Sequence, residues 1–142
     1  MQKVHRQYVA TLAWAIWFGG LTFYAAVVVP TGTKVLGVSE QGFVTQQVTQ
    51  WLNLIGAGAL AILLWNTVAQ PSKLLLITWI VLAFLQLALF GLHWQLDGLL
   101  DSQARELIDP ERFSGLHELY EFTSALQWLA GLAHLWYVLK RT

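Results

Sequence analysis

Four long apolar runs constrain the fold of this chain more than any other feature. They cover residues 8–30, 43–69, 73–96 and 113–139. Each run has the roughly 20 apolar residues that a helix needs to cross the hydrocarbon core of a bilayer. The sequence therefore predicts an all-α integral membrane protein. Its expected architecture is an antiparallel four-helix transmembrane bundle, with residues 1–142 forming a single domain.

The composition agrees with a bilayer environment. Of 142 residues, 56% are hydrophobic and only 11% are charged, whereas soluble domains contain about 25% charged residues. No cysteine is present, which excludes disulfides, zinc–thiolate sites and iron–sulfur clusters. The net charge of zero argues against nucleic acid as a partner.

Helix breakers and caps separate the first three runs. Pro30 lacks a backbone donor, so we expect it to kink or end the first helix, with the chain turning at Gly37. Ser39 is a favourable N-cap for the second helix. Residues 70–72, with the sequence Gln-Pro-Ser, predict a short turn, so the second and third runs form an antiparallel hairpin.

Residues 97–112 form the largest hydrophilic connection, between the third and fourth runs. We expect a short surface helix here, capped by Asp101 or Ser102. Asp109 and Pro110 then predict the start of the fourth helix, because an acid suits the N-cap and proline suits the first helical position.

Charge is distributed unevenly once four spans are drawn. An even number of spans places both termini on one side of the membrane. All acidic residues fall on the other side, so the positive-inside rule predicts cytoplasmic termini. We expect the bacterial inner membrane. The basic residues on the side of the termini are Lys3, Arg6, Lys73, Lys140 and Arg141, and the acids opposite are Glu40, Asp97, Asp101, Glu106, Asp109, Glu111, Glu118 and Glu121.

The fourth run carries a polar stripe that a lipid-facing helix would not tolerate. Its members recur every three or four residues, which places them on one face of a helix. Ionisable side chains in a membrane helix must face protein, water or an ion. The stripe consists of His117, Tyr120, Glu121, Ser124, Trp128 and Gly131.

Further polar residues extend this stripe across the bundle. We interpret them as interhelical hydrogen bonds in a packed bundle, and a narrow hydrated path is the alternative. This wider polar stripe, which runs over the second, third and fourth helices, consists of Gln46, Gln50, Asn53, Gln86, Tyr120, Ser124 and Gln127.

Two histidine–acid pairs lie at the same end of the third and fourth runs. His93 and Asp97 are four residues apart, and so are His117 and Glu121. Two imidazoles and two carboxylates suit a transition metal such as zinc, copper, iron or manganese. Ligation of haem by His93 and His117 is a second possibility. The alternative is a polar cluster in which each histidine and its carboxylate satisfy one another.

Two stretches resemble a known family. WFGGLTFYAAVVVPTGTKVLG is similar to the W-x-G-G-x-x-F-x-x-x-V-V-x-P signature of a family of small membrane proteins that includes transmembrane protein 205. RFSGLHELYEFTSALQWLAGL is similar to the final span of that family, with its F-x-x-L-H-x-x-Y pattern. The resemblance implies a four-span fold and no particular reaction. The matching residues are Trp17, Gly19, Gly20, Phe23, Pro30, Phe113, Leu116, His117, Tyr120, Ser124 and Gln127.

A more distant likeness is to the copper-resistance D proteins and their haem-binding relatives. These proteins also show W-x-G-G near a histidine within the first span. Here the corresponding residues 8–15 contain no histidine, and His5 lies before them. The sequence therefore departs from that pattern at the position where the resemblance would imply a haem ligand.

Three functions follow as expectations. The first is a non-enzymatic accessory or partner-binding subunit of a membrane assembly, in contact with lipid and with other membrane chains or a second copy. The second is a metal- or haem-binding membrane protein that uses the four residues of the histidine–acid pairs. The third is a small transporter or channel.

Overall fold

The computed structural model describes residues 2–70, 72–101, 104 and 106–140, and almost all of this part is helical. The helices have the lengths that the apolar runs predict. The elements are α1 (Gln2–Phe23), the π-helical segment η1 (Tyr24–Val28), α2 (Val29–Leu36), α3 (Val38–Val68), α4 (Lys73–Asp97), β1 (Leu100–Asp101), β2 (Glu106–Leu107) and α5 (Pro110–Leu139).

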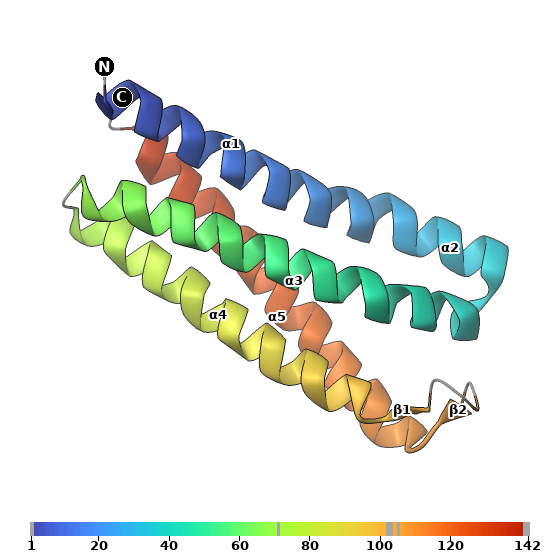
Figure 1. Ribbon diagram of the computed structural model, residues 1–142. Coiled ribbons are helices and arrows are strands. Elements are labelled where there is room, and N and C mark those ends of the chain that lie inside the picture. Colours follow the sequence, from blue (N-terminus) through green and yellow to red (C-terminus); the bar gives the residue numbers. More distant parts are fainter. Residues whose placement is uncertain (1, 71, 102–103, 105, 141–142) are drawn as a thin grey trace.

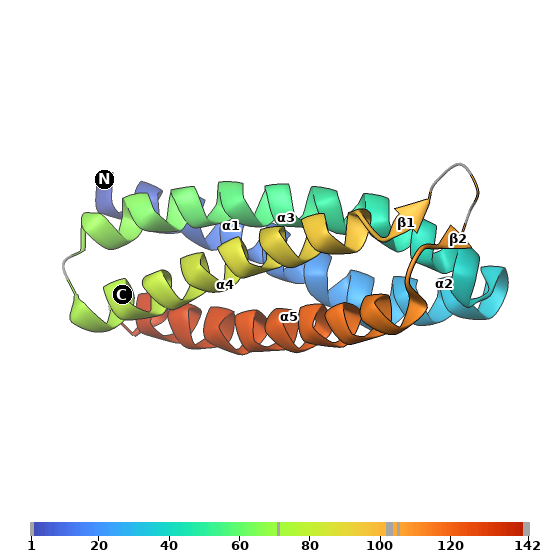
Figure 2. The ribbon, with the colours of Figure 1, turned by 90° about the horizontal axis from the view of Figure 1, so that it is seen from below.

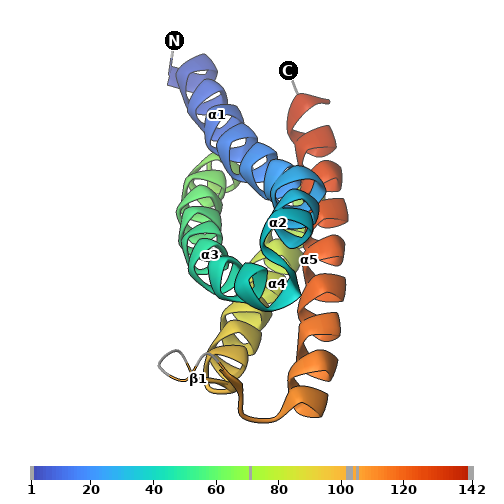
Figure 3. The same cartoon turned by 90° about the vertical axis from the view of Figure 1, so that its right-hand side faces the viewer.

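Four antiparallel rods make up the molecule. The continuous rod α1–η1–α2 packs along α3, and α3 packs along α4. Both termini lie at one end of the bundle, together with the turn between α3 and α4 (Figure 1). In the view from below, α4 lies between α3 and α5 (Figure 2). α5 packs most extensively on α4 and touches α1 over a smaller area, so it covers one side of the bundle (Figure 3).

Three of the rods are long and apolar enough to cross a bilayer. They are Gln2–Leu36, Glu40–Val68 and Lys73–Asp97. Within the described residues α5 does not meet the same apolar criterion, because its first half carries the polar stripe. The prediction of an all-α fold is therefore confirmed, and three helices have the length and composition of membrane-spanning helices.

The first rod continues past Pro30 to Leu36, so of the two expectations for Pro30, a kink or an end, the end is wrong. In a regular helix the ring of a proline clashes with the carbonyl four residues earlier. Here a π turn comes directly before it, in which the backbone N–H of Val29 donates to the carbonyl of Tyr24. Such local π adjustments let a membrane helix continue past a proline. The rod ends at Gly37, whose φ of 84° suits glycine.

The observed helix ends bear out one predicted cap and overturn another. Asp109 is the N-cap of α5, since its Oδ1 accepts from the backbone N–H of Arg112 at 3.0 Å. α3 begins at Val38, with Gly37 at the N-cap position. Ser39 therefore lies within the first turn of α3, and the prediction that it caps this helix is wrong.

The expected surface helix between the third and fourth runs is also wrong. β1 and β2 pair as two short antiparallel strands instead. Asp101 does not cap a helix, because its Oδ1 accepts from the backbone N–H of Ala104 at 2.9 Å and stabilises a turn. The other proposed cap, Ser102, lies outside the described residues.

The core of the bundle lies where α1, α3 and α4 meet. Trp17 and Leu63 are buried there almost completely. Gly56 lets these helices approach closely: a Cβ at this position would lie 2.6 Å from Gln86 Oε1 and 2.8 Å from Trp17 Nε1. Because Gly56 has no side chain, the side chains of Trp17 on α1 and Gln86 on α4 both pack against the backbone of α3 at this position.

Candidate functional site

An aromatic stack joins α1 to α5 near the middle of the bundle. The rings of Trp14 and Phe18 stack at 4.3 Å, and those of Phe18 and Trp128 at 5.0 Å. The indole N–H of Trp128 donates to Thr22 Oγ1 at 2.9 Å, and that of Trp14 donates to the carbonyl of Gly131 at 3.1 Å. Buried indole N–H groups usually find such partners. The stack holds the two helices together over a short stretch.

A cavity of about 700 Å³ lies next to this stack, in the half of the bundle remote from the termini. This volume is within the range of ligand sites, about 300–1,000 Å³. Its wall comes from α1, η1, the first residue of α2, α3, α4 and α5. Aromatic rings, aliphatic side chains and a few hydroxyl and amide groups share the lining. The aromatic members are Trp17, Tyr24, Tyr120 and Trp128.

The cavity is open on the side between η1 and α5. Exposed residues of both elements line the cavity there: Ala25 and Ala26 of η1, and Ala125 and Leu129 of α5. The neighbouring side chains on the outer surface are apolar: Phe23 and Phe122 are each 61% exposed. The opening therefore lies in a surface of the kind that contacts lipid.

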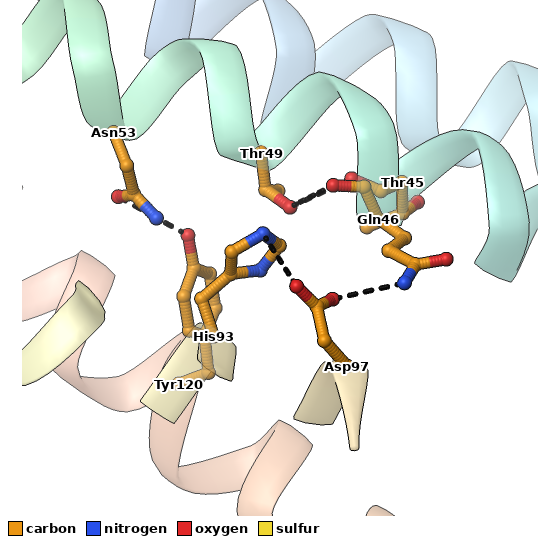
Figure 4. A network of polar contacts seen from close by, with 7 residues as sticks. All are labelled: Thr45, Gln46, Thr49, Asn53, His93, Asp97 and Tyr120. Carbon is orange, nitrogen blue, oxygen red and sulfur yellow. Dashed lines mark hydrogen bonds and ion pairs between the residues drawn. The ribbon is translucent and has the colours of Figure 1, made fainter. Parts of the chain in front are cut away.

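A chain of buried amides crosses the bundle at the inner wall of the cavity. Gln127 Nε2 donates to Gln86 Oε1 at 3.0 Å, and Gln86 Nε2 donates to Asn53 Oδ1 at 3.2 Å. The hydroxyl of Tyr120 donates to the same oxygen of Asn53 at 3.5 Å (Figure 4). α3, α4 and α5 are linked in this way. Interhelical hydrogen bonding, the preferred interpretation of the polar stripe, is thus observed for these four residues.

Two polar groups in the cavity wall lack a hydrogen bond. Asn53 is only 4% exposed and Tyr24 only 7%. Neither Asn53 Nδ2 nor the hydroxyl of Tyr24 has a partner of good geometry among the described residues, although Thr45 lies beside Tyr24. Buried polar groups nearly always have partners. These two groups are therefore candidates for contact with a ligand.

A second set of polar contacts links α3 to α4 at the edge of the bundle (Figure 4). His93 Nε2 lies 3.5 Å from Asp97 Oδ2. Asp97 Oδ1 also accepts from Gln46 Nε2 at 3.0 Å. Asp97 thus contacts His93 on its own helix and accepts a hydrogen bond from Gln46 on α3.

The two predicted histidine–acid pairs both form, but they remain separate. His117 Nδ1 lies 3.6 Å from Glu121 Oε1, and the two side chains are 40% and 65% exposed. No group of three or more His, Asp or Glu side chains in the described part of the chain is arranged to hold a metal ion. The four proposed ligands His93, Asp97, His117 and Glu121 are therefore not brought into one site. Each histidine lies beside its own acid, but the buried Nε2 of His93 makes no hydrogen bond of good geometry, so mutual satisfaction of histidine and acid is not shown for that pair.

The predicted stripe on α3 follows the wrong face in part. Gln50 is exposed and Gln46 is half-buried, whereas Thr49 and Asn53 are buried. Thr45, Thr49 and Asn53, each four residues apart, line the cavity. That spacing was a usable signal in the sequence. Ser124 also lines the cavity, as its place in the stripe suggested.

Tyr24 is the site residue that sequence reasoning missed. It is buried and begins the π turn. Its signal was weak, because it is one tyrosine inside a long apolar run. The following Pro30 indicated only a helix breaker, and the sequence did not predict the π turn that begins at Tyr24.

The chain matches no protein-family model, and no curated protein or solved structure is significantly similar to it. The resemblance to the family of transmembrane protein 205 thus stays a prediction. Several of the residues that carry it line the cavity. They are Trp17, His117, Tyr120, Ser124 and Gln127.

Proposed function

We propose that this protein is a four-span membrane protein that binds a lipophilic small molecule in the cavity between η1 and α5. One observation carries this proposal: an interhelical cavity of about 700 Å³ is bordered by exposed apolar side chains of η1 and α5. A molecule dissolved in the bilayer could enter there without crossing water. Small-molecule sites commonly lie between the helices of a bundle and combine an apolar lining with a few polar groups.

The packing of α5 along the other helices supports four spans. α5 runs the length of α4 (Figure 2). Its residues Tyr120 and Gln127 take part in the amide chain, and Ser124 and Trp128 line the cavity. The low apolarity of α5 therefore has a partly local cause, because Tyr120 and Gln127 face the bundle, whereas Glu118 and Glu121 are exposed. Residues on its outer face, such as Phe122, are apolar and exposed.

The exposed apolar surface bears on the expected role as an accessory subunit. Large exposed apolar side chains occur on every helix, for example Ile16, Trp51, Phe84 and Trp136. Lipid contact requires such an all-round distribution. It does not favour one face as a protein interface, so the accessory role and self-association stay predictions from the sequence. A transporter role also stays a prediction.

Blocking the cavity tests the proposal. Ala125 lines the cavity from α5, so Ala125→Phe should fill the space near the opening. Ala133 is an exposed alanine on the same helix that does not line the cavity, so Ala133→Phe is the matched control. Protein purified from native membranes in mild detergent is analysed by native mass spectrometry and by solvent extraction.

We expect the wild-type protein and Ala133→Phe to carry a stoichiometric lipophilic compound that Ala125→Phe lacks. Equal retention in all three proteins, or retention in none of them, would contradict the proposal. The helical circular dichroism of each variant shows whether it folds.

A further inference from the structure

We infer that the ligand of this cavity is a neutral lipophilic molecule with a hydrogen-bond-accepting carbonyl oxygen on a flat ring. The inference rests on the proposed function and adds the chemical class of the ligand. Three properties of the cavity wall carry it: its hydrogen-bond balance, its charge and its aromatic rings.

The hydrogen-bond balance leaves a buried donor of the wall without an acceptor. Gln86 donates through Nε2 to Asn53, and its own oxygen accepts from Gln127. The hydroxyl of Tyr120 points to the same oxygen of Asn53. The donors of the chain thus converge on one oxygen, and the group left over at Asn53 is the donor Nδ2. A carbonyl oxygen of a ligand would supply the acceptor that the protein does not.

Two hydroxyl groups of the wall already have partners within the protein. Thr49 Oγ1 donates to backbone carbonyls of its own helix. Thr22 Oγ1 donates to the carbonyl of Phe18 and accepts from Trp128. The hydroxyl of Tyr24 is buried beside the cavity and makes no hydrogen bond of good geometry, so it offers a second donor.

The charge of the wall favours a neutral ligand. None of the described residues that line the cavity is lysine or arginine, and the ionisable residues among them, other than the tyrosines, are His117 and Glu121. Glu121 is largely exposed at the edge. A phosphate or carboxylate entering from the bilayer would meet this acid and no fixed cation, which is unfavourable at low dielectric. Anionic lipid headgroups and fatty acids are therefore poor candidates.

The aromatic lining favours a flat ring. Trp17, Tyr24, Tyr120 and Trp128 all border the cavity. Aromatic rings prefer offset-stacked or edge-to-face contact with other rings. A ring with a carbonyl oxygen, such as that of a quinone, could contact these side chains and the two free donors together. An alkyl tail would leave through the opening past Ala125 and remain in lipid.

Three probes with the same alkyl tail test the inference: decylbenzoquinone, decylbenzene and decanoate. Each is titrated into delipidated full-length protein, and bound molecules are counted by native mass spectrometry. We expect decylbenzoquinone to bind one to one and about tenfold more tightly than decylbenzene, since two hydrogen bonds separate the probes. Decanoate should bind most weakly.

The variant Tyr24→Phe removes one proposed donor and keeps the ring. It should weaken the binding of decylbenzoquinone about two- to tenfold, the effect of one hydrogen bond, and leave decylbenzene unchanged. Tyr8→Phe is the control, because Tyr8 is exposed and does not line the cavity. If Tyr24→Phe does not fold, the comparison of the three probes on the wild-type protein still decides.

The outcomes separate this inference from the proposed function. Equal binding of decylbenzoquinone and decylbenzene, both blocked by Ala125→Phe, would overturn the carbonyl inference and leave the binding function intact. Tightest binding by decanoate, blocked by the same variant, would also overturn it and indicate an anion site. If Ala125→Phe affects no probe, the cavity is not the binding site and both proposals fail.

Discussion

Gln86 is the residue on which the polar interior of the bundle depends most. It is 4% exposed and bridges Gln127 on α5 to Asn53 on α3. A buried amide that loses its partner keeps the full cost of its desolvation. In membrane proteins such hydrogen bonds contribute modestly, because the unfolded helices also find partners in the bilayer.

Replacing Gln86 should therefore destabilise the bundle measurably. We expect Gln86→Leu to lower the free energy of unfolding by about 1–2 kcal/mol, since Gln127 Nε2 loses its acceptor and Asn53 loses a donor. The measurement is equilibrium unfolding by increasing SDS in mixed micelles, followed by circular dichroism. Gln50→Leu is the control, because Gln50 is exposed on α3, and it should change the free energy by less than about 0.5 kcal/mol. Equal losses in the two variants would refute a structural role for the amide chain.

Among the elements, α3 decides how closely the helices approach. Its glycines illustrate this at two positions only two residues apart. A Cβ at Gly56 would meet Gln86 and Trp17, whereas a Cβ at Gly58 would meet nothing within 4 Å. Gly56 is therefore needed for packing, and Gly58 is not.

Alanine substitutions at these two glycines should have opposite effects. Gly56→Ala forces α1 or α4 away from α3, and overpacking of this kind costs about 1–3 kcal/mol. Gly58→Ala lowers the flexibility of the unfolded chain and should be neutral or stabilising by up to about 1 kcal/mol. SDS unfolding of both variants measures the difference. A Gly56→Ala variant as stable as the wild type would show that Gln86 and Trp17 move aside without cost.

At the scale of the whole molecule, the two ends of the bundle differ in charge. Lys3, Arg6, Lys73 and Lys140 belong to the helix ends on the side of both termini, and the acids of the chain lie toward the opposite end, where β1 and β2 are (Figure 1). The positive-inside rule assigns the basic end to the cytoplasm. The structure itself contains no membrane, so this orientation is a prediction.

Cysteine labelling tests the orientation and the number of spans together. The chain has no cysteine, so each introduced thiol is the only one. With a membrane-impermeant maleimide on intact cells, we expect Lys34→Cys and Glu106→Cys to be labelled, and Lys3→Cys and Lys140→Cys to be protected until the cells are opened. Labelling of Lys140→Cys but not Lys3→Cys in intact cells would mean an odd number of spans.

Much of the fold was predictable from local properties of the sequence. The four helices follow from apolar length, and the start of α5 follows from Asp109 and Pro110. The short strands β1 and β2 were not predictable in this way. Residues 97–112 have a composition that suits either a surface helix or a turn, and the hydrogen bond from Ala104 to Asp101 selects the turn.

The candidate site was predictable only in part. The polar face of α5 and the residues Asn53 and Gln86 were identified, because buried polar residues in apolar helices are conspicuous. The face of α3 was assigned through Gln50, and the structure turns Thr49 inward instead. Thr49 and Gln50 are adjacent and point about 100° apart around the helix, so they do not both face the cavity. The hydroxyl of Thr49 can be buried because it donates to the carbonyl of Thr45 on its own helix.

Apolar length and charge are properties of each segment alone, so the sequence predicts long apolar helices with their acids at one end. The cavity between η1 and α5 follows only from tertiary packing, because its wall combines residues of helices that are distant along the chain. The aromatic stack that joins α1 to α5 likewise depends on contacts between distant segments, and no local pattern in the chain specifies it.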